Sequence, residues 1–367
     1  MRILHVLAEQ GFSGGENQLL ATLRYLQGRG HEQVLVVTQG ARFSGSVQQL
    51  GIPVHELKIR NNYDLVAALA LRKHYRSIAP DLVHLTCSRS HKIGAMAGIF
   101  GSALPPKVVT RRMDYPIGNS WFRRWTYRRA VDGVVAISQG VLEAILAVGV
   151  DRSKVHLINE GVDTRHFGEL RTEQRRGAAR QRLGLGDNDI LGVTTASLHV
   201  RKAHDVLLEA LARVAVPNGK RIVWLFGGDG PERSKLLAQA DRLPEQFDIR
   251  IPGQIDYVED ALAAADFYCL PSRYEGLGVA LLEALATGAP CIASRVGGMR
   301  EVLESGVSGI HVEVEDVGGL TAAIQSLVDD PALADRLGVA GMQRAKDRFD
   351  ISLMGRKTET LYESLVS

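Results

Sequence analysis

Residues 270–290 read LPSRYEGLGVALLEALATGAP, and this stretch carries the most informative pattern in the chain. The apolar run over 266–270 predicts a buried strand, and the run that follows Gly276 predicts a helix that ends at Gly288. Two glycines, Gly276 and Gly278, would let a ligand approach bare backbone N–H groups at the start of that helix, where the helix dipole also favours an anion. The stretch therefore predicts a place to hold a nucleotide diphosphate.

Two carboxylates flank this glycine turn. Glu283 lies about two turns into a helix whose other residues are almost all apolar, so its carboxylate either faces water along one exposed stripe or needs a partner to offset desolvation. Glu275, just before the helix, favours the second alternative, because two carboxylates beside an anion site suit the hydroxyls of a sugar and a ribose. The pattern PSRYEGLG, followed by EALATGAP, resembles the donor-site signature of retaining glycosyltransferases of family 4.

Length and composition are those of an ordinary globular protein. The 367 residues are too many for one ordinary core and predict two domains. With 45% hydrophobic residues, 23% charged residues and a net charge of +3, any attraction to an anionic partner must come from local clusters of charge. The three cysteines stand singly in apolar surroundings, which indicates core thiols in a reducing cytoplasm rather than a disulfide framework or a zinc site.

The N-terminal apolar run is too short for a signal peptide, and no window is long enough to cross a membrane. We therefore expect a cytoplasmic protein that is at most peripheral at the inner face of the cytoplasmic membrane.

The first half alternates strands with helices, which predicts a parallel sheet whose loops gather at the carboxyl ends of the strands. It begins with a strand, a glycine loop and an amphipathic helix, as a Rossmann-like unit does, although the three-glycine dinucleotide fingerprint is absent. The predicted strands are 2–7, 33–38, 82–86, 107–110, 133–137 and 155–158, and the predicted helices are 16–28, 63–78, 92–100 and 140–148. A ligand in this half should meet Gly14, Gly15 and the loops 88–91 and 111–115.

Arg111, Arg112 and Asp114 follow the strand over 107–110. Many members of the family have a histidine at about this point, and this sequence has RRMD instead. Asp114 could orient an acceptor hydroxyl or accept its proton, with Arg111 or Arg112 on a phosphate or an acidic sugar; alternatively, the arginines pair with nearby acids on a solvated loop. His91 is a further candidate for acceptor binding on a neighbouring loop, although a lone histidine is more often structural.

Residues 121–129 read WFRRWTYRR and interleave arginines with aromatic rings. Such a segment could lie on an anionic membrane surface, with its rings at the interface and its cations on lipid phosphates. It could equally pack its rings inward beneath a basic exterior, because residues 121, 122 and 125 recur at helical spacing. A single-stranded nucleic acid is a third alternative, which we do not expect to be the partner.

The polar segment 159–167 and the charged run that follows it to Arg182 indicate a domain boundary. The segment resembles the family's Asn-Gly-Val-Asp crossover, except that Glu160 stands between Asn159 and Gly161. We expect an N-terminal acceptor-binding domain over 1–165, joined by the C-terminal helix 352–367, and a nucleotide-sugar-binding domain over 166–351.

Arg201 and Lys202 follow the first strand of the second half, just before a helix. A basic pair at this position either neutralises a diphosphate or consists of exposed cations near a turn. Gly228 and Gln254 follow later strands of the same predicted sheet, and in relatives the loop around Gln254 lies along the nucleotide base. The predicted strands of this half are 190–197, 221–226, 249–251, 266–270 and 291–294, and its later helices are 317–327, 331–348 and 351–366.

The resemblance covers nearly the whole chain and implies a GT-B architecture, in which two Rossmann-like α/β domains face each other across a cleft. It implies a metal-independent, retaining hexosyl- or related glycosyltransferase (EC 2.4) that uses a nucleotide sugar, with UDP favoured. The implied acceptor is a cell-envelope glycan or glycolipid such as lipopolysaccharide.

The implied roles are as follows. Arg201 and Lys202 stabilise the leaving diphosphate, Glu275 holds the sugar, and Asp114 acts on the acceptor. The residues that bind the donor are Gly14, Gly15, Gly228, Gln254, Gly276, Leu277, Gly278, Val279 and Glu283. The residues that bind the acceptor are Arg111, Arg112 and His91.

Two other kinds of protein fit the same pattern. A nucleotide-sugar epimerase, or a phosphorylase, could use a two-domain cleft, although we identify no lysine that would hold the phosphorylase's pyridoxal group. A non-catalytic nucleotide-sugar-binding protein is the second alternative, because the family's histidine is missing.

Overall fold

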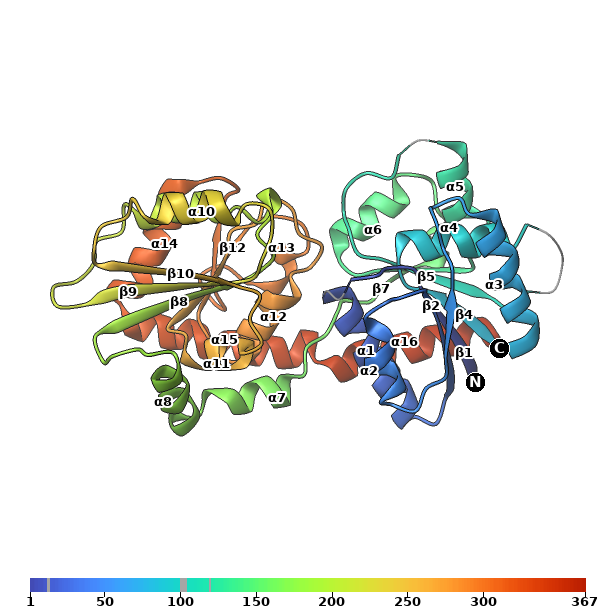
Figure 1. Ribbon diagram of the computed structural model, residues 1–367, viewed down its shortest axis with the longest axis horizontal. Coiled ribbons are helices and arrows are strands. Elements are labelled where there is room, and N and C mark those ends of the chain that lie inside the picture. Colours follow the sequence, from blue (N-terminus) through green and yellow to red (C-terminus); the bar gives the residue numbers. More distant parts are fainter. Residues whose placement is uncertain (12–13, 100–103, 119) are drawn as a thin grey trace. The chain divides into compact units, whose positions relative to one another are not determined.

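The computed structural model describes residues 1–11, 14–99, 104–118 and 120–367 (Figure 1). The chain forms two compact units, the first from Met1–Glu160 with Ile351–Ser367 and the second from Gly161–Asp350. Each unit is built on its own sheet, of seven strands in the first and six in the second. This confirms the predicted fold class, an α/β protein with two Rossmann-like units.

The sheet of the first unit has the strand order β3-β2-β1-β4-β5-β6-β7, and all neighbouring strands are parallel. A helix follows nearly every strand, because parallel neighbours need a crossover connection. The elements are β1 (Arg2–Leu7), α1 (Gly14–Gly28), β2 (Glu32–Thr38), α2 (Phe43–Gln48), β3 (Val54–Leu57), α3 (Leu65–Ile78), β4 (Leu82–Leu85), α4 (Ser88–Ala97), β5 (Lys107–Arg111), α5 (Trp121–Arg128), β6 (Gly133–Ala136), α6 (Gln139–Leu146), η1 (Arg152–Lys154), β7 (Val155–Leu157) and α16 (Ile351–Val366).

The sheet of the second unit has the order β10-β9-β8-β11-β12-β13, again with parallel neighbours. In Figure 1, α10 and α14 lie on one side of β8–β10, and α11 and α15 lie on the other. The elements are α7 (Thr164–Gly168), η2 (Glu169–Arg171), α8 (Glu173–Arg182), β8 (Asp189–Thr195), η3 (Val200–Lys202), α9 (His204–Leu211), β9 (Arg221–Gly227), α10 (Arg233–Ala240), β10 (Phe247–Gly253), α11 (Val258–Ala264), β11 (Phe267–Leu270), α12 (Val279–Ala286), β12 (Cys291–Ser294), α13 (Met299–Val302), β13 (Ile310–Val312), α14 (Val317–Asp329) and α15 (Pro331–Phe349).

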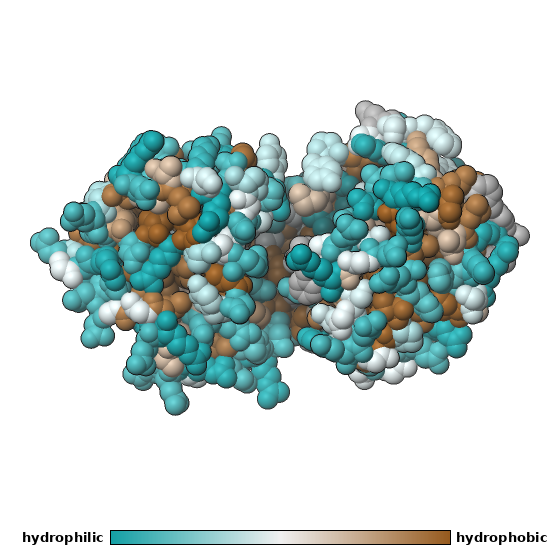
Figure 2. Space-filling model, viewed as in Figure 1, coloured by the Kyte–Doolittle hydropathy of each residue, from teal (hydrophilic) through white to brown (hydrophobic). Residues whose placement is uncertain are grey.

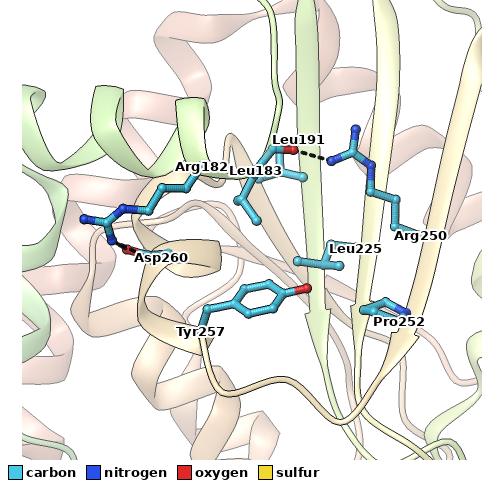
Figure 3. Close-up of a pocket in the computed structure, with 8 residues that line it drawn as sticks. All are labelled: Arg182, Leu183, Leu191, Leu225, Arg250, Pro252, Tyr257 and Asp260. Atoms are coloured by element: carbon cyan, nitrogen blue, oxygen red, sulfur yellow. Dashed lines mark hydrogen bonds and ion pairs between the residues drawn. The ribbon is translucent and has the colours of Figure 1, made fainter.

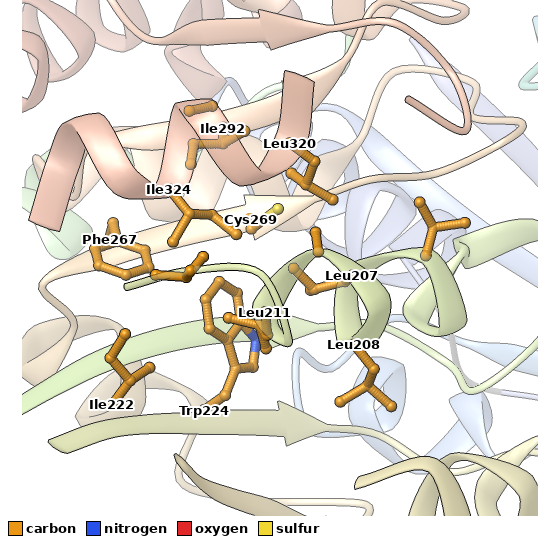
Figure 4. Packing of buried hydrophobic residues seen from close by; sticks show 14 of the residues in the cluster. Leu207, Leu208, Leu211, Ile222, Trp224, Phe267, Cys269, Ile292, Leu320 and Ile324 are labelled. Carbon is orange, nitrogen blue, oxygen red and sulfur yellow. The ribbon is translucent and has the colours of Figure 1, made fainter. Parts of the chain in front are cut away.

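The core of the second unit is centred on Trp224, whose side chain is fully buried (Figure 4). Its ring packs against Phe267 at a centroid distance of 5.5 Å, beneath leucines of α9 and α14. Gly192 on the neighbouring strand makes room for it, since a Cβ atom there would lie 2.5 Å from the indole ring. This packing fixes β8 beside β9 and so positions the loop that follows β8.

Helix α16 at the C-terminal end of the chain packs on α1 within the first unit. Tyr25 fits against Gly355, where a Cβ atom would lie 2.4 Å from its ring. The Glu359 carboxylate accepts hydrogen bonds from Arg29 at 3.1 Å and from the ring of His31 at 2.9 Å. The polypeptide therefore ends in the unit in which it began.

The structure corrects the starts of two predicted helices and adds a helix that was not predicted. Helix α4 begins at Ser88 and not at residue 92, so the expected loop over 88–91 is the first turn of that helix, capped by the Cys87 side chain. The helix predicted from Gly276 begins at Val279, because Gly278 has a φ of +91°, which a right-handed helix cannot include. Helix α8, for which the sequence predicted no element, lies in the charged run that ends at Arg182.

Candidate functional site

Lys202 and Glu275 form an ion pair at the carboxyl edge of the second sheet. Lys202 lies in the loop after β8 and Glu275 in the loop after β11, and these two strands are neighbours although β9 and β10 separate them in the sequence. The strand order reverses at this point, where ligands of open parallel sheets bind. The two side chains are only 11% and 12% exposed, whereas Arg201 beside them is exposed to solvent. Folding thus brings together two of the predicted catalytic residues.

Arg273 joins the two loops that carry this pair. Its guanidinium donates two hydrogen bonds of 3.0 Å to the Asp205 carboxylate and one of 2.5 Å to the Val200 carbonyl. It also pairs with Glu315 at 2.8 Å, and its own backbone N–H donates to the carbonyl of Arg201 at 2.8 Å. Arg273 lies inside the signature but was not among the predicted site residues. Its role depends on Asp205 and Glu315, which only the fold brings near.

The helices that start at this edge of the sheet have no side-chain caps. These five helices, which follow β8 to β12, are α9, α10, α11, α12 and α13. Within the described part of the chain, the N–H groups of Val279 and Ala280 have no hydrogen-bond acceptor. Such groups, together with the helix dipole, form an anion-binding site. By contrast, α3, α4, α5 and α6 of the first unit are capped by Asp64, Cys87, Ser120 and Ser138.

Glu283 lies on α12, one turn from these amides, and its side chain is partly buried. Burial raises the pKa of its carboxyl group to about 7, and the nearby charge of Glu259 adds to the effect. No residue in the described ranges donates a hydrogen bond to this carboxylate. A carboxyl group in this state gains from a ligand that supplies hydroxyl donors.

The glycine turn after β9 packs closely against the loop after β8. A Cβ atom on Gly228 would lie 2.0 Å from the Ala196 carbonyl oxygen, and one on Gly230 would lie 2.4 Å from that of Leu198. Close backbone approach therefore explains both glycines without a ligand. Gln254, after β10, is exposed.

The remaining signature residues lie at the start of α12. Leu277 is buried, so only its backbone could face a ligand. The Gly276 carbonyl accepts a hydrogen bond of 2.9 Å from the Gly298 N–H, which ties the signature to the turn after β12. Gly278 packs against Met299, where a Cβ atom would lie 3.2 Å from the methionine side chain.

In the first unit, both arginines of the predicted acceptor loop have partners. Arg112 donates to the Glu160 carboxylate at 2.7 Å, and its side chain covers Gly15, where a Cβ atom would lie 3.4 Å from it. Arg111 bonds to the Tyr127 hydroxyl at 3.2 Å. The alternative in which an arginine pairs with a nearby acid is therefore correct for Arg112, and Glu160, which departs from the family's crossover pattern, is its partner. Gly14 is the first residue of α1.

His91 is not on a loop, and this prediction was wrong. It lies in α4, is 2% exposed, and hydrogen-bonds through Nε2 to the Thr126 carbonyl at 3.0 Å. Its ring meets that of Tyr127 at a centroid distance of 4.4 Å, and burial lowers the pKa of His91 to about 4. His91 is therefore a structural residue that joins α4 to α5. Asp114 is partly buried beside Gly140, at the start of α6.

The structure excludes full inward packing of the rings over 121–129. Trp121 is 76% exposed, Phe122 and Trp125 are partly buried, and Tyr127 is buried. Arg123, Arg124, Arg128 and Arg129 are all exposed. The segment thus presents rings as well as cations to solvent.

A cavity of about 430 Å³ lies elsewhere in the second unit, between β8–β10, the end of α8 and the start of α11 (Figure 3). Apolar side chains and the ring of Tyr257 form most of its wall. Its charged residues are already paired, Arg182 with Asp260 at 2.8 Å and Arg250 with Asp248 at 2.8 Å. None of the predicted donor residues lines this cavity.

Two kinds of feature are absent from the described ranges. No group of three or more histidines, cysteines, aspartates or glutamates is placed to hold a metal ion. No described helix has both the length and the apolar character that a membrane span requires.

Comparison with known families identifies the chain. Residues 12–166 match the family model described as Glycosyltransferase Family 4, and residues 189–330 match the model described as Glycosyl transferases group 1. The chain belongs to the group 1 glycosyltransferases of family 4. This glycosyltransferase is 28% identical over 288 residues to a GDP-mannose-dependent monoacylated alpha-(1-6)-phosphatidylinositol monomannoside mannosyltransferase of Corynebacterium glutamicum, covering 74% of each chain. It is 30% identical over 252 residues to an alpha-maltose-1-phosphate synthase of Mycobacterium tuberculosis, covering 64% of each.

Solved structures agree on the fold of this glycosyltransferase. Anabaena Alr3699/HepE in complex with UDP superposes with a TM-score of 0.86 at 20% identity, over 99% of this chain and 100% of that one. A glycosyltransferase from Rickettsia africae superposes with a TM-score of 0.87 at 20% identity, over 100% and 98%. At these identities the likeness establishes the GT-B fold class.

Proposed function

We propose that this glycosyltransferase transfers a sugar from a nucleotide sugar, with UDP favoured, to a cell-envelope glycan or glycolipid such as lipopolysaccharide, retaining the anomeric configuration and using no metal ion. The observation that carries the proposal is the buried Lys202–Glu275 pair beside the uncapped start of α12. A cation, free amides and a carboxylate at one edge of a sheet match the diphosphate and sugar parts of such a donor.

The proposed mechanism follows from where charge develops. When the bond between the sugar and the diphosphate breaks, negative charge grows on the diphosphate. Arg201, Lys202 and the amides of α12 are positioned in advance to stabilise that charge, which lowers the barrier without reorganisation of solvent. Glu275 fixes the position of the Lys202 ammonium group and offers its remaining lone pairs to sugar hydroxyls. Ribose hydroxyls are the proposed donors to Glu283.

The acceptor proposal rests on relatives and on the first unit. The C. glutamicum relative is named for a phosphatidylinositol mannoside acceptor, and a lipopolysaccharide outer core galactosyltransferase, WaaB, shares the fold with a TM-score of 0.73. Asp114, which has no hydrogen-bond partner within the described residues, is the proposed contact of the acceptor hydroxyl. Arg111 and Arg112 are proposed to shape this region, since both already hold protein partners. We place the reaction at the inner face of the cytoplasmic membrane.

The test is incubation of the protein with UDP-, GDP- and ADP-linked sugars, with and without extracted envelope glycolipids. The proposal predicts release of the nucleoside diphosphate and a product that keeps the donor's anomeric configuration. A sugar that changes configuration while still attached to its nucleotide would favour an epimerase. Binding without turnover of any donor would favour a non-catalytic nucleotide-sugar-binding protein.

A further inference from the structure

The outward face of α3 is apolar at its N-terminal end. Leu65, Val66 and Leu69 are 47%, 66% and 49% exposed, and Tyr63, just before the helix, is 56% exposed. Figure 2 shows hydrophobic residues gathered over α3 on the face in view. The outward face of a surface helix is ordinarily polar, and a contiguous apolar patch marks an interaction site. The core contacts of α3 come from other residues, which are Ala67, Ala68, Leu71 and Tyr75.

Aromatic contacts join this face to α5. The ring of Tyr63 lies 5.5 Å from that of Phe122, and Phe122 lies 5.7 Å from Trp125. Trp125 in turn stacks on Trp121, with the two rings 15° from parallel and 6.2 Å apart. Two elements that are far apart in the sequence thus form one continuous surface. We define the α3–α5 surface as Tyr63, Leu65, Val66, Leu69, Trp121 and Phe122.

The charged residues on the two helices that form this surface are all basic. Neither α3 nor α5 contains an acidic residue. Lys73 and Arg76 are exposed on the later turns of α3, and Arg123 is exposed between the rings of α5. The Lys92 ammonium group lies 5.9 Å from the centre of the Tyr63 ring. Apolar side chains and rings bordered by cations complement a partner whose surface is negatively charged and whose interior is apolar.

We propose that the α3–α5 surface binds an anionic lipid bilayer, with its rings and leucines at the level of the headgroups and its cations on lipid phosphates. Bilayer binding fits better than a protein partner, because Lys73 and Lys92 border the surface and lysine is depleted at protein interfaces. The inference rests on the proposed function in one respect: the α3–α5 surface would hold the enzyme where a glycolipid acceptor is presented. The surface extends the segment over 121–129 with a face of α3 that the sequence pattern did not reveal.

Vesicle binding by the full chain tests the proposal. We expect sedimentation with vesicles of equal parts phosphatidylcholine and phosphatidylglycerol, weaker binding to phosphatidylcholine alone, and loss of binding at high salt. Val66→Glu with Leu69→Glu should lower the partition coefficient at least about tenfold, because each buried methylene contributes to binding. Lys73→Gln with Arg76→Gln should lower it about fivefold per charge removed. The matched control is Val339→Glu in α15, where the native valine is also 66% exposed, and it should bind as the wild type does.

Bromine-labelled lipid provides an independent readout. Trp224 is fully buried in the other unit, so quenching of tryptophan fluorescence reports on Trp121 and Trp125. Unchanged partition of the double Val66/Leu69 variant, or vesicle binding without quenching, would overturn the proposal. So would a loss of self-association or of RNA binding in that variant with its vesicle binding intact, because either result assigns the surface to another partner. Release of nucleoside diphosphate from a nucleotide sugar, with water or a detergent-solubilised glycolipid taking the sugar, should persist in the variant, which separates failure of this inference from failure of the proposed function.

Discussion

Replacing Glu283 by glutamine should stabilise the free protein above neutral pH. Burial raises the pKa of Glu283 to about 7, compared with an ordinary value of 4.5. The folded state therefore holds this proton more tightly than the unfolded state does, and the free energy of unfolding falls as the pH rises from 4.5 to about 7. The shift corresponds to about 3 kcal/mol of the free energy of unfolding. This contribution is fully lost above about pH 8. Glutamine keeps the shape of the side chain and does not ionise, so the variant should not show this loss.

Thermal unfolding without ligand, at about pH 5 and about pH 8, measures the effect. The variant and the wild type should melt at nearly the same temperature at the lower pH, and the variant should melt roughly 6–12 °C higher at the upper pH. The control is Glu209→Gln, because Glu209 is 53% exposed and forms only a surface pair with Arg213, so its loss should change stability by less than about 1 kcal/mol.

The same samples with UDP test the ligand role of Glu283. Binding to the folded state should raise the melting temperature of the wild type, by an amount equivalent to about 2.7 kcal/mol at one hundred times Kd. At about pH 8, where Glu283 of the wild type is ionised, the variant should show little of this increase, because it has lost an ionised acceptor. An identical pH dependence in both proteins would refute the reasoning about burial. Full UDP stabilisation of the variant would refute the ribose role.

Two further substitutions test how the site is built. Arg273→Met should lower the free energy of unfolding by about 2–3 kcal/mol and weaken donor binding, because it removes the charged hydrogen bonds that join the two loops. The matched control, Arg213→Met, should be close to neutral in urea denaturation. Equal effects of the two substitutions would contradict the joining role of Arg273. Gly228→Ala should destabilise the second unit by about 2–3 kcal/mol, because its Cβ atom would meet the Ala196 carbonyl at 2.0 Å. Gly177→Ala, in open space on α8, should be neutral or stabilising by up to about 1 kcal/mol, and calorimetry that ranks the two substitutions in the opposite order would exclude the close-approach explanation.

The fold and the signature could be predicted from the sequence because they depend on local patterns. Short apolar runs separated by amphipathic segments determine the alternation of strands and helices, and Glu275 lies within one motif. Lys202 belongs to a different loop, and its partnership with Glu275 follows from the strand order, which local patterns do not specify. Arg273 was not selected for the same reason, since its partners Asp205 and Glu315 are distant in the sequence.

The predictions that were wrong concern local exceptions. Helix α4 starts earlier than predicted because a cysteine, Cys87, takes the capping role that serine, threonine, aspartate or asparagine usually fills. Helix α8 was not predicted, because it is almost entirely polar and therefore lacks an amphipathic pattern. It is held instead by Arg176 and Arg180, which pair with Asp266 at 2.5 and 3.2 Å. Burial of His91 could not be predicted because it depends on the packing of α4 against α5.

The most direct test of the central claim is the anomeric configuration of the glycosidic bond that the enzyme forms between the sugar of an α-linked nucleotide sugar and an extracted envelope glycolipid, read by proton NMR of the product. The account predicts an α product, and it predicts that Lys202→Met lowers the rate by about 10²–10³-fold, because one preorganised cation on the leaving diphosphate is lost. Lys235→Met, at a site 68% exposed in the same unit, should leave the rate unchanged. A β product, or a Lys202→Met variant as fast as the wild type, would contradict the account.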